Sequence, residues 1–294
     1  MMKGIILAAG KGTRLYPATL PVCKPLVPVY DKPLIYYPLT NLMQAGIKDI
    51  LIIVPPGDRS KFEKMFGDGS SIGIHIEYTE QKKQRGIADA LIIGADFIGN
   101  DNVCLILGDN IFYGTGFRQK LRQAVKGLTD GAEIFGYYVE DPRPFGVVEF
   151  DEDGSAVSLE EKPKRPRSNY IVPGLYFYDN TVIDIAKRVK PSARNELEIT
   201  SVNKTYLVQG RLNVITLCDE TTWFDAGSAD SLYRAACSIR AAQKSGTVIG
   251  CPEETSFRNH WITADELKKS ADRLQKTKYG LYLNSVYSEA IDND

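Results

Sequence analysis

The feature that most limits how this chain can fold is a short apolar run near its start that ends in a glycine-rich loop. Residues 5–8 are apolar, and the residues that follow include Gly10, Gly12 and Arg14. An apolar run of this length, bounded by glycine, predicts a buried β-strand. Glycines and an arginine after a strand can present backbone N–H groups and a guanidinium to a phosphate. The segment therefore predicts an α/β protein with a phosphate-binding loop.

Three kinds of phosphate site use such a loop, and the residues here favour one of them. A Walker A loop ends in Lys-Ser or Lys-Thr, which this segment lacks. The dinucleotide fingerprint needs a third glycine where a helix starts, but here Leu15 stands there and Pro17 follows. An NAD-dependent oxidoreductase is therefore disfavoured. The third kind cradles a nucleoside triphosphate while Arg14 binds it bidentately, and Lys24-Pro25 further along argues against a plain glycine turn.

Apolar runs alternate with helical patterns through the first half of the chain. The expected strands cover residues 5–8, 49–54, 74–79, 103–107 and 132–139, and the expected helices cover residues 34–45, 61–66, 87–97 and 117–126. Continuous apolar runs are typical of strands that are buried on both faces. The alternation predicts a three-layer α/β/α fold with a mostly parallel central sheet, whose ligands bind at the carboxyl ends of the strands.

The middle of the chain has a different pattern. The expected elements are a β-hairpin with strands over residues 147–150 and 156–159, a β-rich segment over residues 170–178, and helices over residues 181–189 and 196–208. The hairpin is expected because the sequence DEDG lies between two runs of strand-forming residues.

After Ser228 the chain is expected to be helical almost to its end. Ser228 or Asp230 can cap the first of these helices, and Thr263 with Glu266 forms a capping box for a later one. We therefore expect a core over residues 1–228 and a C-terminal helical region over residues 229–294 that packs on it.

Composition excludes several classes of function. The 294 residues carry 36 Lys and Arg against 37 Asp and Glu, so no general basic field attracts nucleic acid or a membrane surface. Two histidines far apart in the sequence argue against a histidine-based zinc site or catalytic triad. Five scattered cysteines predict reduced thiols in a cytoplasmic protein, and no apolar run approaches the length of a membrane span.

A series of motifs resembles a known family. Gly10, Gly12, Arg14, Pro17, Thr19, Lys24 and Pro25 follow the signature of the sugar-1-phosphate nucleotidylyltransferases. The stretches VYDKPLIYYPL, LGDNIFYG, FGVVEFD, LEEKP, SNYIVPGLYFYD, ELEIT and CPEE, in this order along almost the whole chain, resemble the glucose-1-phosphate thymidylyltransferases of deoxysugar synthesis. The ordered series is more specific than any one motif, and it implies the nucleotidyltransferase fold.

The reaction that the resemblance implies joins dTTP and α-D-glucose 1-phosphate into dTDP-glucose and releases pyrophosphate. Two anions must meet in line, so the site needs cations from several directions and a hydrated Mg²⁺. The resemblance assigns Arg14 to the departing pyrophosphate, Lys24 to the α-phosphate and Lys162 to the sugar phosphate. It assigns the Mg²⁺ to Asp109 and Asp225. Asp109 follows a buried apolar run, where a carboxylate would face the ligand crevice.

Binding residues follow from the same resemblance. The nucleotide is implied to contact Leu7, Ala9, Gly10, Gly12, Thr13, Arg14, Lys24, Gln81, Gly86 and Asp109, and the sugar phosphate is implied to contact Gly146, Glu161, Lys162, Val172, Tyr176 and Trp223. Gln81 and Gly86 are assigned to the base and ribose, since a glutamine amide both donates to and accepts from a pyrimidine. Glu161 can accept hydrogen bonds from sugar hydroxyls. Tyr176 and Trp223 can also be plain core aromatics.

Departures from the family pattern lie near the base and the sugar. Pro25 stands where glutamine is frequent, residues 81–86 read QKKQRG where QPSPDG is usual, and Phe145 replaces a frequent tyrosine. The charged groups of the catalytic set are all retained. The choice between dTTP and UTP therefore stays open, whereas a non-catalytic sugar-nucleotide sensor is disfavoured because it would have lost one of these groups.

The resemblance also implies a homotetramer that is inhibited by a downstream dTDP-sugar at a second site. Tyr113, Gly114 and residues 251–254 resemble parts of that site, whereas Thr115 stands where histidine is common.

Overall fold

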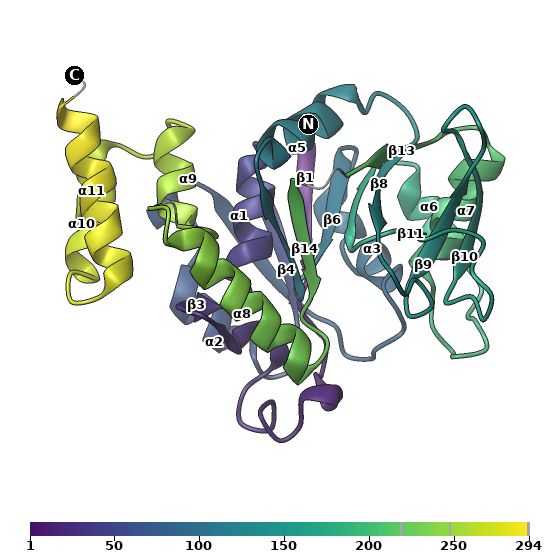
Figure 1. Cartoon of the computed structure of the whole chain (residues 1–294), viewed down its shortest axis with the longest axis horizontal. Helices are drawn as coiled ribbons and strands as arrows, with labels where there is room; N and C mark the ends of the chain where they lie inside the picture. Colours follow the sequence, from purple (N-terminus) through teal and green to yellow (C-terminus); the bar gives the residue numbers. More distant parts are fainter. Residues whose placement is uncertain (218–219, 247, 293–294) are drawn as a thin grey trace.

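Four parallel strands form one half of the large sheet in the computed structural model, which describes residues 1–217, 220–246 and 248–292 (Figure 1). They lie in the order β6 (Asn102–Leu107), β1 (Met2–Leu7), β4 (Asp49–Val54) and β5 (His75–Glu80). Most side chains of β1, β4 and β6 are buried, as a sheet with both faces covered requires. The strands predicted in this part of the chain are confirmed.

An antiparallel half extends the sheet from β6. Its strands are β12 (Leu175–Tyr178), β8 (Ala132–Tyr138), β11 (Tyr170–Ile171), β9 (Gly146–Phe150) and β10 (Ala156–Glu161), and β13 (Leu212–Thr216) pairs with β8 in parallel. β12 runs antiparallel to both β6 and β8. The predicted hairpin is formed by β9 and β10. The sheet as a whole is mixed.

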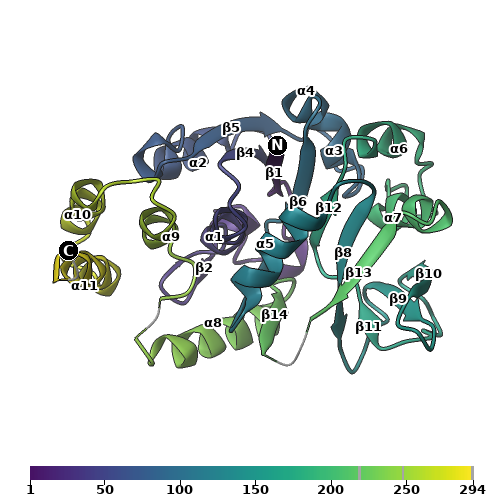
Figure 2. The same ribbon diagram turned by 90° about the horizontal axis from the view of Figure 1, so that it is seen from above.

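Helices cover both faces of this sheet (Figure 2). One face packs against α1 (Tyr36–Gln44), α2 (Arg59–Phe66) and α5 (Phe117–Gly127), and the other packs against α3 (Asp89–Ile93), α4 (Ala95–Ile98), α6 (Val182–Arg188) and α7 (Ile199–Val208). Leu39, Phe62 and Leu121 belong to the first apolar layer. Leu91 and Val202 belong to the second. The predicted α/β/α arrangement is confirmed.

Two small sheets were not expected from the sequence. β7 (Asn110–Gly114) follows β6 at once and pairs antiparallel with β14 (Thr221–Asp225), and β2 (Pro28–Val29) pairs with β3 (Lys32–Pro33). The large sheet also contains β13, which the sequence analysis missed.

Three expected elements were wrong in extent. The helix over residues 87–97 is two helices, since it breaks at Gly94, where a Cβ would lie 2.6 Å from Ile5 Cδ1. The helix over residues 196–208 begins only at Ile199. Leu197 N donates to Arg85 O at 2.5 Å and Leu197 O accepts from Ala88 N at 3.1 Å, so these residues form a loop contact.

The third is the β-rich segment over residues 170–178, which is interrupted. Residues 172–174 separate β11 from β12, and Val172, Pro173 and Gly174 line a cavity that is described below.

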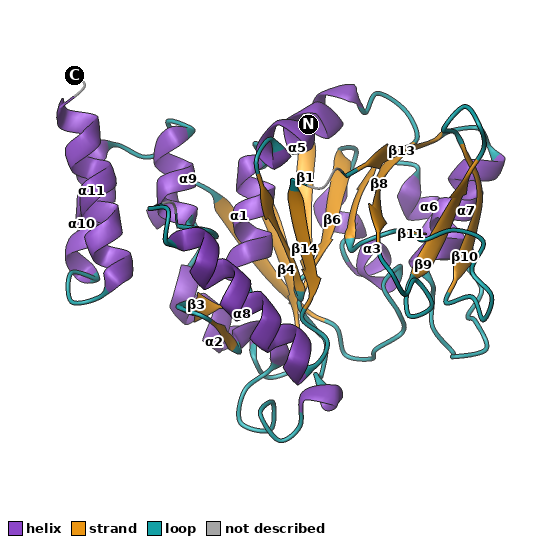
Figure 3. Ribbon diagram, viewed as in Figure 1, coloured by secondary structure: helices purple, strands orange, loops and turns teal. Residues whose placement is uncertain are grey.

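The C-terminal part is helical, as expected (Figure 3). It contains α8 (Ala229–Gln243), α9 (Pro252–Arg258), α10 (Ala264–Arg273) and α11 (Lys278–Asp292). Ser228 caps α8 by accepting from Ser231 N, and Thr263 and Glu266 form the predicted capping box of α10. α10 and α11 lie at the end of the molecule away from α6 and α7 (Figure 1).

Cys23, Cys104, Cys237 and Cys251 are free thiols, whereas Cys218 lies outside the described residues. None of the helices within residues 1–217, 220–246 and 248–292 combines the length and the apolar character that crossing a membrane requires.

Candidate active site

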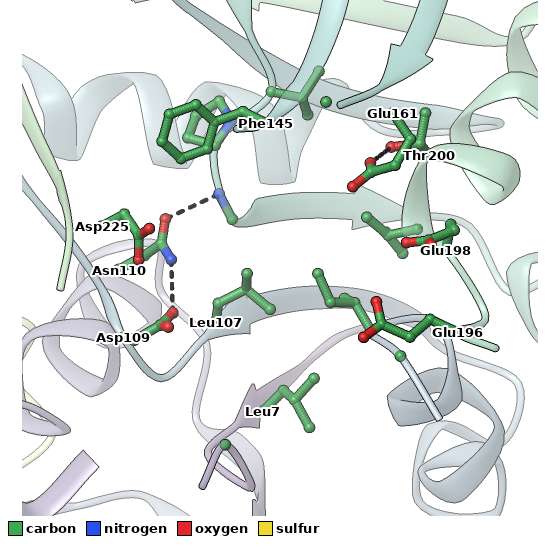
Figure 4. Close-up of a pocket in the computed structure, with 18 of the residues that line it drawn as sticks. Leu7, Leu107, Asp109, Asn110, Phe145, Glu161, Glu196, Glu198, Thr200 and Asp225 are labelled. Carbon is green, nitrogen blue, oxygen red and sulfur yellow. Dashed lines mark hydrogen bonds between the residues drawn. The ribbon is translucent and has the colours of Figure 1, made fainter. Parts of the chain in front are cut away.

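A cavity of about 690 Å³ opens where β1, β5 and β6 end. All of the predicted site residues line it except Ala9 and Lys24, which are buried beside it. Figure 4 shows Asp109 and Asp225 on one side and Glu161, Glu196 and Glu198 on the other. The site therefore has two polar sides, which lie over the ends of the central strands. The roles given to its residues stay predictions.

The loop after β1 has a backbone that only glycine accepts easily. Gly12 has φ 64°, and a Cβ there would lie 3.0 Å from Lys24 Cβ. Thr19 Oγ1 donates to Gly12 O at 2.7 Å, which closes the loop. Ala9 is 3% exposed and accepts through its carbonyl from Gln84 Nε2 at 2.9 Å. The loop is thus held in place before a ligand binds.

Lys24 and Asp109 form a tight ion pair. Lys24 Nζ lies 2.5 Å from Asp109 Oδ2, and Lys24 is 6% exposed. Burial opposes ionisation of Asp109, but the Lys24 ammonium and the Asn110 amide outweigh it and lower the pKa of Asp109. The carboxylate is therefore kept charged, and Lys24 is directed toward it.

Asp225 reaches Asp109 through strand pairing. The register of β7 and β14 places Asp225 opposite Asn110, and Ala226 N donates to Asp109 O at 2.9 Å. Burial and the charge of Asp109 raise the pKa of Asp225, against the opposing charges of Lys24, Arg14 and Lys162. Two carboxylates that repel one another favour a divalent cation between them, and hard oxygen donors suit such a metal.

Gly227 leaves room for Arg14 beside this pair. A Cβ on Gly227 would lie 3.0 Å from Arg14 Nη2 and 2.8 Å from Asp225 Oδ2. The guanidinium of Arg14 and the carboxylate of Asp225 are therefore close neighbours, although they come from separate segments.

Asn110 was missed as a site residue, although it lies in the quoted LGDN motif. Its Nδ2 donates to Asp109 Oδ1 at 2.9 Å (Figure 4). Its Oδ1 accepts from Trp223 Nε1 at 2.6 Å and from Gly174 N at 3.1 Å. Asn110 therefore links Asp109 to Trp223 and to the segment between β11 and β12.

Glu161 is held on the other polar side by two residues that were also missed. Thr200 Oγ1 donates to Glu161 Oε2 at 2.5 Å, and Arg194 Nη2 donates to Glu161 Oε1 at 3.1 Å. Arg194 also pairs with Glu196 and Glu198. Thr200 lies in the ELEIT motif and could have been found there, whereas Arg194 has no local signal because a loop arginine is usually solvated.

The wall between the two sides is aromatic. Trp223 packs against Phe145 with ring centroids 5.3 Å apart, and Tyr176 is 3% exposed. Lys162 follows β10 in a left-handed conformation with φ 46°, and its N–H donates to Phe145 O at 2.9 Å. A non-glycine residue in this conformation needs support from its surroundings, and such residues are frequent at functional sites.

Gly86 and Gln81 line the part of the cavity nearest β5. Gly86 has φ 102°, and a Cβ there would lie 2.5 Å from Leu197 O. Gln81 is 5% exposed, and its backbone N–H donates to Val54 O at 3.0 Å. The loop that carries both residues is thus joined to the segment of Glu196 and Glu198.

Comparison with known proteins gives a consistent result. The family model described as Nucleotidyl transferase matches residues 3–242. A glucose-1-phosphate thymidylyltransferase from Neisseria gonorrhoeae is 53% identical over 283 residues, covering 96% of this chain and 98% of that protein. One from Mycobacterium tuberculosis is 52% identical with the same coverage.

Solved structures agree with the fold. A Bacillus anthracis structure, described as a glucose-1-phosphate thymidylyltransferase in complex with a sucrose, has a TM-score of 0.75 and 41% identity, covering 82% of this chain and 96% of that chain. A UDP-glucose pyrophosphorylase complexed with UDP-glucose has a TM-score of 0.72 and 25% identity, covering 82% of this chain and all of that chain.

Proposed function

The chain belongs to the nucleotidyl transferase family, and from this premise we propose that it makes dTDP-glucose and pyrophosphate from dTTP and α-D-glucose 1-phosphate. The observation that carries the proposal is the arrangement of the cavity, with Lys24, Asp109 and Asp225 on one side and Glu161 with Arg194 on the other. Such a cavity can hold a triphosphate and a sugar phosphate at the same time.

In the proposed reaction a phosphate oxygen of glucose 1-phosphate attacks the α-phosphorus of dTTP. A new O–P bond forms as the bond from the α-phosphorus to the bridging oxygen of the β-phosphate breaks, and pyrophosphate leaves. Lys24 neutralises charge on the α-phosphate, and Arg14, next to Asp225, binds the pyrophosphate with its planar fork. Lys162 binds the attacking phosphate, where its charge lowers the cost of bringing two anions together.

We propose Mg²⁺ as the metal of this site. Asp109 and Asp225 would hold it, since both are carboxylates and the raised pKa of Asp225 reflects burial and the neighbouring charge of Asp109. When bound, Mg²⁺ would offset charge on the triphosphate. Within the described residues no third His, Cys, Asp or Glu joins these two in a metal-binding cluster, so phosphate oxygens and water would complete the coordination.

The sugar would lie against Glu161 and the aromatic wall. Glu161 is positioned by Thr200 and Arg194, and its carboxylate can accept hydrogen bonds from glucose hydroxyls. Arg194 is 41% exposed at its side chain, and it also pairs with Glu198, whose side chain is 10% exposed, so it links Glu161 to the neighbouring loop.

The test is pyrophosphate release with glucose 1-phosphate and Mg²⁺, comparing dTTP with UTP. We expect release with dTTP, and we expect Asp225→Asn to reduce it by about 100-fold or more, since the site would lose one of its two metal carboxylates. Preference for UTP would keep the mechanism and change the substrate, as the similarity to UDP-glucose pyrophosphorylase allows. No release with either nucleotide would refute the proposal.

A second cavity supports feedback inhibition by a dTDP-sugar. It has a volume of about 360 Å³, and Tyr113, Gly114 and Thr115 line it together with Arg118. Asn41 also lines it, and Asn41 Oδ1 is buried without a hydrogen-bond partner among the described residues. We expect dTDP-sugars to inhibit pyrophosphate release by the wild-type chain. A Thr115→Trp variant, whose indole would fill the second cavity, should stay active at the same dTDP-sugar concentrations. We also propose that the chain forms the homotetramer that its family resemblance implies, and sedimentation equilibrium tests this.

A further inference from the structure

A buried carboxylate lies beside the residue that we assign to the base. Gln81 Nε2 donates to Asp89 Oδ2 at 2.9 Å, and Arg85 Nη2 donates to Asp89 Oδ1 at 2.6 Å. Asp89 is 1% exposed, whereas Gln81 is 5% exposed and lines the active cavity. Both carboxylate oxygens of Asp89 therefore have a partner: one accepts from the Gln81 amide, and the other pairs with the Arg85 guanidinium.

The backbone holds these three residues in fixed relation. Gln81 directly follows β5, and its N–H donates to Val54 O. Asp89 is the first residue of α3, whose preceding residue Ala88 donates to Leu197 O at 3.1 Å. Arg85 is 55% exposed at its side chain, so it can neutralise Asp89 from the rim of the site. The glutamine side chain is thus anchored from the side that faces away from solvent.

An ionised carboxylate can only accept hydrogen bonds, so its partner must present a donor. Gln81 can therefore turn only its amide nitrogen toward Asp89. A rotation of the amide by half a turn would place Gln81 Oε1 against Asp89 Oδ2, and two buried acceptors would face each other without a proton between them. The amide consequently shows the cavity one orientation only, with its carbonyl oxygen and its second N–H in fixed places.

We propose that Asp89 is a positioning residue that fixes the amide of Gln81 and so restricts the enzyme to pyrimidines with an imide edge, thymine and uracil. The inference rests on the proposed function, because it takes Gln81 as the base contact. Thymine and uracil present an N–H at position 3 beside a carbonyl at position 4. Cytosine presents an acceptor at position 3 beside an amino group, so it fits only the flipped amide.

The experiment compares dTTP with dCTP in pyrophosphate release, for the wild-type chain and for Asp89→Asn. Asparagine has nearly the same shape, but it can either donate to or accept from Gln81, so the amide becomes free to flip. We expect the ratio of kcat/KM for dTTP to that for dCTP to fall by about tenfold or more in the variant.

Asp179→Asn is the matched control. Asp179 is 5% exposed and is also paired with an arginine, Arg211, but it hydrogen-bonds Gly131 N and Tyr206 in the core, away from the active cavity. This variant should lose stability and keep the nucleotide ratio. An unchanged ratio in Asp89→Asn overturns the proposal, and so does an equal fall in both variants, because general loosening would then explain the result.

Binding calorimetry with dTTP and dCTP separates this inference from the proposed function. If the wild-type chain releases no pyrophosphate, the proposed function fails, and the affinity ratio for the two nucleotides still tests Asp89 with the same two outcomes. If the wild-type chain binds neither nucleotide, both fail. Asp89→Ser replaces Asp89→Asn if the latter does not fold, since a serine hydroxyl also donates or accepts.

Discussion

At the scale of single residues, attraction and repulsion between buried charges control which groups of the active cavity are ionised. Lys24 keeps Asp109 ionised, and Asp109 in turn opposes the ionisation of Asp225. Arg14 approaches the pair where Gly227 has no side chain. A small steric change at this point should therefore alter the chemistry more than the stability of the fold.

Gly227→Ala tests this expectation. Gly227 does not have a left-handed φ, and its added Cβ would meet only the ends of the Asp225 and Arg14 side chains, so the backbone can stay in place. We expect kcat to fall by about 10- to 100-fold, because displaced catalytic groups lose alignment. The thermal midpoint should change little.

Gly127→Ala is the control for this variant, since its nearest contact would be Glu133 Oε2 at an ordinary 3.8 Å. Equal activity in both variants would show that the space beside Arg14 has no role.

Glu133 supplies a prediction about pH. It is 8% exposed on β8, and Glu133 Oε1 has no hydrogen-bond partner among the described residues. Burial raises the pKa of Glu133 above its ordinary value of 4.5. The contribution of Glu133 to the free energy of unfolding is complete at pH values below its ordinary pKa. It is lost as the pH rises through the raised pKa of the folded state. Glu133→Gln should therefore stabilise the fold by about 1 kcal/mol at pH 8 and by much less at pH 4.

Thermal unfolding at the two pH values measures this effect. Glu160→Gln, at an exposed position of β10 in the same sheet, should change the midpoint at neither pH. If Glu133→Gln raised the thermal midpoint equally at pH 4 and pH 8, burial of the Glu133 carboxylate could not be the cause.

At the scale of elements, pairings between distant segments build the site. The ribbon of β7 and β14 brings Asp225 to Asp109, and the contact between Arg85 and Leu197 brings the base side to the sugar side. The sequence analysis predicted neither strand of this ribbon. β7 was missed because its few residues follow a buried strand directly and have no separate periodicity.

Gly86→Ala should weaken the contact between the two sides. The substitution adds a strained φ of 102° and a clash with Leu197 N and O, so we expect about 1–3 kcal/mol of destabilisation and higher KM values for both substrates. Gly154→Ala is the matched control. Gly154 has a φ of 79° and a Cβ there would meet no other atom, so the substitution adds backbone strain without a clash. Equal effects on KM would show that the contact with Leu197 is irrelevant to binding.

At the scale of the whole molecule, the C-terminal helices are tied to the first part of the chain. Lys32 Nζ donates to Ile249 O at 2.9 Å and lies 5.4 Å from the ring centres of Tyr37 and Tyr279. Asn259 Nδ2 donates to Met43 O at 2.9 Å, at the end of α1. We propose that residues 1–228 form the catalytic core and that residues 229–294 brace it and shape the second cavity.

A chain that ends at Gly246, which keeps α8 but lacks α9, α10 and α11, tests the role given to these last three helices. It keeps every residue of the active cavity but lacks Val248, Ile249 and Gly250, which line the second one. We expect a lower thermal midpoint, residual pyrophosphate release and no inhibition by dTDP-sugars. Retained inhibition would place the regulatory site elsewhere.

The charged groups of the predicted catalytic set were indicated by the resemblance of the motifs to a known family. The sequence by itself determined the local features: the loop after β1, the buried parallel strands and the caps at Ser228 and Thr263. These follow from the composition and periodicity of short segments, which act over a few residues. Only the tertiary structure decided that Asp89 holds Gln81, that Arg194 and Thr200 hold Glu161, and that Asn110 joins Asp109 to Trp223. The physical reason is that a polar side chain in a loop has the same local pattern whether water or a distant residue is its partner, and burial through long-range packing makes that choice.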